Sequence, residues 1–194
     1  VAVLGPLART VRDAALLLNV LARYDLRDPF CLPPDSCNTP RDWRDGIEDG
    51  VAGLRIAVLR QPGFEAPVDW EGIAALEQAA EFLVEAGAEV EEADPGLPDM
   101  RAIFAQLWGA ALARLVNGFP ETRRHMLDPG LLEIAAAHAG ASALDMLDFE
   151  AQRIAAAHAM ARFHQRYDLV LCPAVPAAPP LADTPTSNPA EALW

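Results

Sequence analysis

The sequence predicts an α/β fold, and three observations support that prediction. Two short strand-like segments, at residues 54–59 and 88–92, flank a segment with helical periodicity. A helix-rich block follows, and a third strand-like segment at residues 167–172 comes after it. Parallel strands need a crossover connection that is usually a helix, so this alternation indicates a strand–helix–strand unit with parallel strands. With 194 residues the chain is long enough to bury a core.

The first predicted helix covers residues 11–22. Thr10 precedes it and Asp13 stands three residues later, a variant of the capping box that marks helix starts. Apolar residues recur at helical spacing, which predicts one buried face. That face comprises Ala14, Leu17, Leu18 and Leu21. Residues 1–4, before this helix, are short, apolar and strand-like.

Residues 24–53 are predicted to form a long loop. Four prolines stand between positions 29 and 40, and proline cannot donate the backbone hydrogen bond that a continuous helix needs. Loops of this length in compact domains are usually functional or well packed.

The strand at residues 54–59 follows. Its apolar positions are too dense for a solvent-facing edge, so we expect it at the centre of the sheet.

The next helix is predicted over residues 70–86. Asp69 is its expected N-cap, and Gly87 stands just after its end, where glycine is favoured. Its expected inner face consists of Ile73, Leu76, Ala80, Leu83 and Val84. A right-handed crossover then brings the strand at residues 88–92 beside the strand at residues 54–59.

A helical block occupies the following part of the chain. Helices are expected over about residues 99–117, 130–139 and 142–166. The third strand follows at residues 167–172, and the chain after it is rich in proline.

The charge balance excludes two classes of partner. Fifteen basic residues against 28 acidic ones give a net charge of −13. Nucleic acids and anionic membrane surfaces both attract positive protein surfaces, so we expect neither as a partner. No run approaches the ~18 apolar residues that a membrane span needs, and the first residues lack the basic region of a signal peptide.

Lysine is absent, because all fifteen basic residues are arginines. This excludes a Schiff-base lysine, a P-loop lysine and a Ser–Lys catalytic pair. Serine occurs only at positions 36, 142 and 187, never in a Gly-x-Ser-x-Gly turn. We therefore expect no catalytic residue of these types within the chain.

Metal and cofactor motifs are also absent from the sequence. No histidine stands three or four residues from another histidine or a cysteine, and the sequence contains no G-x-G-x-x-G. These absences predict neither a metal site nor a dinucleotide cofactor. The cysteines, at positions 31, 37 and 172, form no C-x-x-C pair, which favours a reducing, cytoplasmic setting.

The turn after the third strand is a candidate pocket wall, because open α/β sheets bind ligands beyond the carboxyl ends of their strands. The candidate residues there are Cys172, Pro173, Val175 and Pro176. Cys172 could be a nucleophile, but it has no basic partner nearby in sequence, so a wall role is favoured. Phe104 and Trp108, four residues apart on one helix, are either a core pair or a wall of an apolar substrate pocket.

Five segments, in order, resemble the amidase signature family. Residues 5–18, GPLARTVRDAALLL, are similar to its GPLART-x-x-DAALLL segment, and residues 167–176, YDLVLCPAVP, to its YDLLLTPTLP strand and turn. Shorter matches lie between them: residues 28–29 (DP), 53–58 (GLRIAV) and 87–90 (GAEV). The five segments span nearly the whole chain.

The resemblance implies part of an amidase-signature α/β/α sandwich, with a mixed sheet, a βαβ unit and a helical block. The family hydrolyses or transfers amide C–N bonds with a Ser–Ser–Lys triad that lies upstream of the GPLART segment. No position here matches that triad, and Cys172 stands where the family usually has threonine. The resemblance therefore implies that residues 1–194 are a single partial domain, the substrate-facing C-terminal portion of an amidase, inactive alone and without a cofactor.

Two other functions stay open at this point. One is a non-catalytic ligand-binding or interaction module on a degenerate amidase scaffold, and the weaker one is a stand-alone enzyme that uses Cys172. The expected partner is a small-molecule amide, bound by the intact parent. A sheet built for a larger sandwich exposes an unpaired edge and an apolar face, so we also expect self-association or contacts with the missing half.

Overall fold

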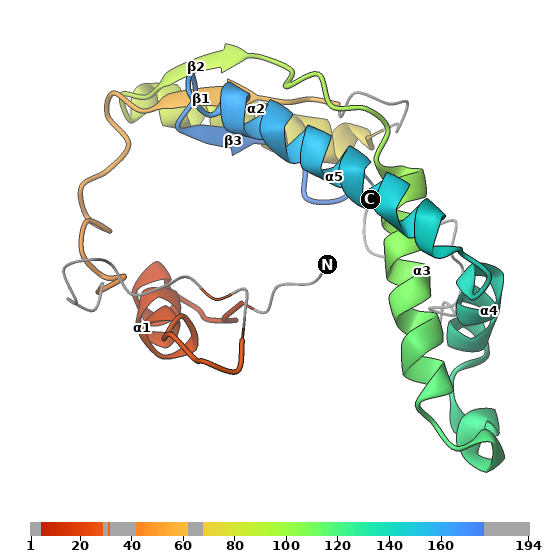
Figure 1. Ribbon diagram of the computed structural model, residues 1–194. Coiled ribbons are helices and arrows are strands. Elements are labelled where there is room, and N and C mark those ends of the chain that lie inside the picture. The colour runs from red at the N-terminus through yellow and green to blue at the C-terminus, as the bar shows by residue number, and fades with distance from the viewer. Residues whose placement is uncertain (1–4, 29–30, 32–41, 62–67, 177–194) are drawn as a thin grey trace. The chain divides into compact units, whose positions relative to one another are not determined.

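The structure of the chain is a computed structural model, which describes residues 5–28, 31, 42–61 and 68–176 (Figure 1). The chain divides into two compact units, residues 1–51 and residues 52–194. The strand expected at residues 1–4 lies outside the described residues, as do the proline-rich residues after position 176. The assignment of the whole chain to a single partial domain stays a prediction.

In the first unit, helix α1 (Val11–Leu21) begins where the sequence predicts. The Thr10 hydroxyl accepts a hydrogen bond from the Asp13 backbone N–H at 3.1 Å, which satisfies one of the donors that a helix start leaves open. Asn19 ties the helix to a later turn. Its side-chain amide donates to Asp42 at 2.8 Å, and its carbonyl oxygen accepts from the backbone N–H of Trp43 at 2.8 Å.

The buried face expected for α1 is wrong in two positions. Leu17 is 43% exposed and Leu21 is 57% exposed, whereas the neighbouring Ala15 is buried. The described turns of this unit lie against the side of the helix that carries Asn19. In the described part of the unit, Leu17 and Leu21 therefore remain exposed.

The second unit contains a parallel three-stranded sheet in the order β2-β1-β3. Its strands are β1 (Arg55–Val58), β2 (Glu89–Glu92) and β3 (Leu169–Leu171). Ile56 lies opposite Val90 on one side and Leu169 on the other, so the central position predicted for β1 is confirmed. Three successive β1 residues, Ile56, Ala57 and Val58, are buried, which requires cover on both faces of the sheet.

Two helices provide this cover. Helix α2 (Trp70–Glu85) connects β1 to β2, and helix α5 (Ala143–Phe163) leads into β3. The two crossovers run in opposite directions across the sheet, so right-handed connections place their helices on opposite faces. Figure 1 shows α2 behind the sheet and α5 in front of it.

Helix α2 has almost the predicted bounds. Gly87 follows it with φ 93°, the left-handed conformation that glycine adopts readily. Asp69 stands at the N-cap position, as predicted. Its side chain, however, makes no capping hydrogen bond to the helix. Of the expected inner face, Leu76 is buried and the residues at positions 73, 80 and 83 are half-buried. The prediction is wrong for Val84, which is exposed; it lies in the last turn of the helix, about 80° round from Leu76.

The remaining helices are α3 (Arg101–Asn117), the 3-10 helix η1 (Glu121–Met126) and α4 (Pro129–His138). Helices α3 and α4 lie side by side (Figure 1). Their buried core comprises Ala113, Val116 and Ala135. Gly109 permits close approach, because a Cβ atom there would lie 2.3 Å from the His138 ring. The sequence did not predict η1, a short 3-10 helix without a 3.6-residue repeat.

The predicted α/β fold class is confirmed. Pairing among the described strands is parallel. Within the described ranges, no helix combines the length and the apolar character needed to cross a membrane.

Candidate functional site

A groove of about 480 Å³ lies at the carboxyl end of β3. One wall is the turn at residues 172–176, and the other is the N-terminal half of α2. Ligands of open α/β sheets bind at such an edge. Four residues proposed from the sequence line this groove: Cys172, Pro173, Val175 and Pro176. That a substrate occupies it stays a prediction.

Backbone hydrogen bonds hold both ends of this turn. At its start, the Leu59 N–H donates to the carbonyl oxygen of Leu171 at 2.9 Å, so β3 stays paired with β1 up to the last residue before the turn. At its end, the Asp69 N–H donates to the carbonyl oxygen of Pro176 at 2.7 Å. The turn is therefore fixed against the first residues of α2.

The α2 wall has small side chains. Gly72, Ala75 and Ala79 line it at intervals of three and four residues, which places them on one face of the helix. Leu76 completes the apolar surface. Short side chains on this wall leave space between α2 and the turn, so the groove is suited to the apolar part of a ligand.

Polar groups in the groove are few. They are the carboxylates of Asp69 and Glu71 and the thiol of Cys172, which is exposed. Among the described lining residues there is no histidine, lysine or arginine. Cys172 thus has no histidine or arginine among the described lining residues to stabilise its thiolate, which favours a wall role over a nucleophilic one.

The groove does not include the aromatic pair predicted as a second pocket wall. Phe104 and Trp108 stack on α3, with ring centroids 5.9 Å apart and an interplanar angle of 12°. Phe104 is half-buried and Trp108 is exposed. Neither lines the groove, so the structure does not bring them together with Cys172. Their role in a substrate pocket stays a prediction.

The contribution of α2 to the groove was missed from the sequence. Asp69 was interpreted only as a helix cap, and Glu71, Gly72 and Ala75 were not singled out. The predicted strand order and helix connections were enough to place α2 beside this turn. In a parallel sheet the helix after β1 begins at the edge where β3 ends, so its first turns face the residues that follow β3.

Side chains at the opposite end of β3 fix this strand to the rest of the sheet. Asp168 accepts a hydrogen bond from the Arg55 backbone N–H at 2.9 Å and forms a salt bridge with its guanidinium at 3.3 Å. These contacts, led by the side-chain hydrogen bond, hold the pKa of Asp168 below its usual value. The buried Tyr167 donates its hydroxyl hydrogen to Glu91 of β2, which raises the pKa of Tyr167. The groove turn follows β3, and these contacts fasten β3 to its neighbour β1 and to β2 on the far side of β1.

Over the described ranges, no group of three or more histidine, cysteine, aspartate and glutamate side chains could hold a metal ion. Cys31 and Cys172 are free thiols, and the Cys31 thiol donates to the carbonyl oxygen of Asp25 at 3.3 Å. Cys37 lies outside the described residues.

Comparison with known proteins gives a family match and several similar proteins. The family model "Amidase" matches residues 1–193. An amidase of Pseudomonas putida is 30% identical over 183 residues, which cover 89% of this chain and 36% of that protein. The A-type subunit of the glutamyl-tRNA(Gln) amidotransferase of Ligilactobacillus salivarius is 40% identical over 89 residues, 46% of this chain and 17% of that protein.

A similar solved structure is that of a bacterial aryl acylamidase of the amidase signature family. It superposes with a TM-score of 0.78 at 27% sequence identity and covers 91% of this chain. The match takes in 37% of the aryl acylamidase chain. The chain therefore spans little more than a third of the P. putida amidase and of this structural relative.

Proposed function

The chain belongs to the amidase family, and from this premise we propose that it is the substrate-facing C-terminal portion of an enzyme that hydrolyses amide C–N bonds. The family match over residues 1–193 carries the proposal. The groove beside Cys172 supports it, because it lies at the sheet edge where α/β enzymes bind ligands.

We assign the chemical step to a part of the parent enzyme outside these 194 residues. The resemblance implies a Ser–Ser–Lys triad, and this sequence contains no lysine. Ser142, the serine in the described ranges, belongs to a helix cap: its hydroxyl donates to Asp145 at 2.7 Å and accepts from the Asp145 N–H at 3.2 Å. It is therefore engaged in starting α5. The coverage of 36% of the P. putida amidase agrees with this division of roles.

The substrate we propose is a small amide with an apolar aryl or alkyl group, bound by the parent. The apolar walls of the groove support this choice, as does the similarity to an aryl acylamidase. In this role the groove positions the apolar group and excludes water, while the amide bond lies toward the catalytic residues. We place the parent in the cytoplasm on the basis of the three cysteines of this chain, which are sparse and form no C-x-x-C pair.

The first experiment measures the intact mass of the polypeptide in its source cells. A mass well above that of 194 residues is expected, and that longer protein should release amine from an aryl acylamide such as acetanilide. The 194-residue chain alone should release none. Release by the chain itself would contradict the proposal, and its loss in Cys172→Ala would support a stand-alone cysteine enzyme instead.

The role of the groove is tested in the longer protein with Ala75→Leu. The larger side chain fills space on the α2 wall, so we expect KM to rise about tenfold while kcat changes little. The matched control is Ala111→Leu, at an exposed position of α3 away from the groove. Equal kinetics for both variants would remove the groove from the proposal. Amide binding without any turnover by the longer protein would favour the non-catalytic module.

A further inference from the structure

A second groove, of about 1140 Å³, lies between the last turn of α3 and η1. Leu115 and Phe119 line its α3 side, and Met126 lines its η1 side. All three apolar side chains are exposed, with Met126 at 74%. The neighbouring Leu127 also lines the groove and packs against the core between α3 and α4. The groove therefore has an apolar floor attached to a packed core.

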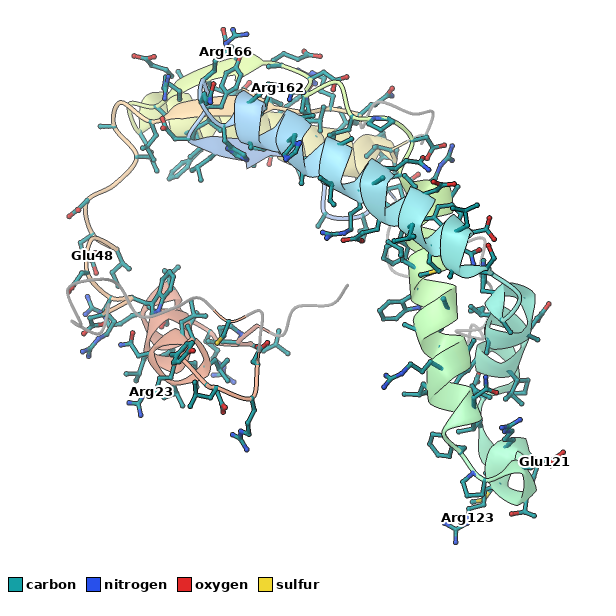
Figure 2. All side chains as sticks on the ribbon, in the orientation of Figure 1. Arg23, Glu48, Glu121, Arg123, Arg162 and Arg166 are labelled. Atoms are coloured by element: carbon teal, nitrogen blue, oxygen red, sulfur yellow. The ribbon has the colours of Figure 1, made fainter. Side chains whose placement is uncertain are left out.

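Two arginines stand on opposite walls of this groove, Arg114 on α3 and Arg123 on η1. Figure 2 shows Arg123 at the tip of this region, extending away from the ribbon. Across the described residues, neither guanidinium group takes part in a salt bridge or a hydrogen bond. They differ in this from Arg55 and Arg60, which are paired with carboxylates.

The neighbouring Arg124 has a separate task. Its guanidinium donates to the carbonyl oxygens of Phe119 at 3.3 Å and Asn117 at 3.5 Å. These bonds offset the partial negative charge at the end of α3, which would otherwise repel an anion. Glu121 is the carboxylate of η1 and does not line the groove. In a chain of net charge −13 the groove is thus a locally positive site with an apolar floor.

From this combination we propose that the α3–η1 groove binds a small amphiphilic anion, a carboxylate with an alkyl or aryl body. A guanidinium group presents two parallel N–H donors that match a carboxylate. The apolar body would cover Phe119 and Met126, removing exposed apolar surface from water. The groove is large enough for a ligand of this size. This inference does not rest on the proposed amide hydrolysis.

A purely structural role for the arginines makes a different prediction. Arg114 lies in the last turn of α3, where a positive charge interacts favourably with the helix dipole. If that were its whole role, its replacement would lower the free energy of unfolding and leave ligand binding unchanged. Binding and stability therefore have to be measured on the same variants.

The test uses decanoate, well below its micelle-forming concentration, titrated into the 194-residue chain by isothermal calorimetry. We expect saturable binding with about one site per chain. Arg114→Gln and Arg123→Gln should each weaken the affinity about tenfold, as expected for loss of a charge-assisted hydrogen bond. The matched control is Arg162→Gln on α5, which removes an exposed arginine without touching the groove (Figure 2).

Two comparisons make the proposal refutable. Decanol has the same apolar body without the charge and should bind at least tenfold more weakly than decanoate. This comparison uses the unaltered chain, so it does not depend on whether a variant folds. Thermal unfolding of each variant is followed by circular dichroism, so that loss of binding is separated from loss of structure. Equal affinity for decanol and decanoate, or equal weakening by Arg162→Gln, would overturn the proposal. Binding of decanoate only when it is embedded in lipid vesicles would overturn it as well.

Discussion

Strand β1 and helix α1 have similarly apolar sequences but very different surroundings. In β1, Ile56 is 1% exposed, and the next two residues are buried as well. In α1, Leu17 and Leu21 are 43% and 57% exposed. The strand has a neighbour on each side and a helix on each face, all from its own unit. The helix, within the described residues of its unit, contacts turns on the side that carries Asn19.

This difference shows what hydrophobic periodicity can and cannot predict. The pattern identifies residues that are able to be buried, because it reports which side chains share a face. Burial also needs a second surface, which other segments of the chain or another molecule must provide. The same kind of pattern therefore predicted the core correctly at β1 and only in part at α1, where Leu17 and Leu21 are exposed.

The largest effect is expected from truncating the core of β1. Ile56→Ala removes a fully buried side chain and should lower the free energy of unfolding by about 2–5 kcal/mol. The matched change Leu17→Ala, in α1, should cost about 1 kcal/mol or less, because much of that side chain is already in water. Urea unfolding followed by circular dichroism measures both. Equal losses in the free energy of unfolding would show that Leu17 is covered in solution. The difference in burial between β1 and α1 would then be wrong.

The next effect concerns the contact between α3 and α4. Gly109→Ala would place a Cβ atom 2.3 Å from the His138 ring, so the helices must separate or the ring must move. Moving the ring would also break the hydrogen bond between His138 and Gln106, which lowers the free energy of unfolding further. We expect a loss of about 1–3 kcal/mol in the free energy of unfolding.

Gly140→Ala is the control for this substitution, because a Cβ atom at Gly140 meets nothing within 4 Å. It should be neutral or slightly stabilising through the unfolded state. In the double variant Gly109→Ala/His138→Ala the clash is removed, so the effects of the two changes should not add. Additive losses would locate the strain elsewhere.

Much of the fold could be predicted from the sequence. The helix at residues 70–86, the central strand and the crossover between β1 and β2 were all expected, because they depend on local periodicity and on the handedness of βαβ units. The close contact of α3 with α4 at Gly109 could not be predicted in this way. Its importance comes from His138, which lies 29 positions further along the chain, and no local pattern connects the two residues.

The candidate site was predicted in part. The turn from Cys172 to Pro176 was placed beyond the end of a parallel strand, and it lines the groove there. The facing wall was missed because Gly72 and Ala75 carry no chemistry that a motif would record. They matter through the space that they leave, and only the packing of α2 against the turn shows it. Phe104 and Trp108 failed to join the groove because a spacing of four residues fixes a shared helix face and not what that face meets.

A smaller effect is expected from the salt bridge that fastens β3 to β1. Asp168→Asn keeps the shape of the side chain but removes the charge that Arg55 stabilises. The pKa of Asp168 is lowered in the folded chain, so its contribution is present above the unfolded-state pKa of about 3.9 and is lost as the pH falls through the folded value. The variant should have a lower urea midpoint than the unaltered chain at pH 7. Below pH about 4 the difference should shrink.

The control for Asp168→Asn is Asp148→Asn on α5. In the described part of the chain the Asp148 side chain forms no salt bridge. Its urea midpoint should match that of the unaltered chain across the same pH range. A pH-independent difference for Asp168→Asn would mean that the carboxylate charge is not what fastens β3.

The smallest effect on stability, and the sharpest test of the contrast between β1 and α1, comes from changing the α1 surface. We expect the chain to self-associate through uncovered apolar residues, so Leu17→Gln/Leu21→Gln should shift its sedimentation toward monomer. The free energy of unfolding should change by about 0.5 kcal/mol or less per substitution, because about half of each side chain is exposed. The α5 pair Leu144→Gln/Leu147→Gln, also exposed, controls for a general loss of apolar surface. If this control pair shifts the sedimentation toward monomer equally, the self-association does not depend specifically on α1. If the unaltered chain is monomeric at every concentration, the expected self-association is wrong.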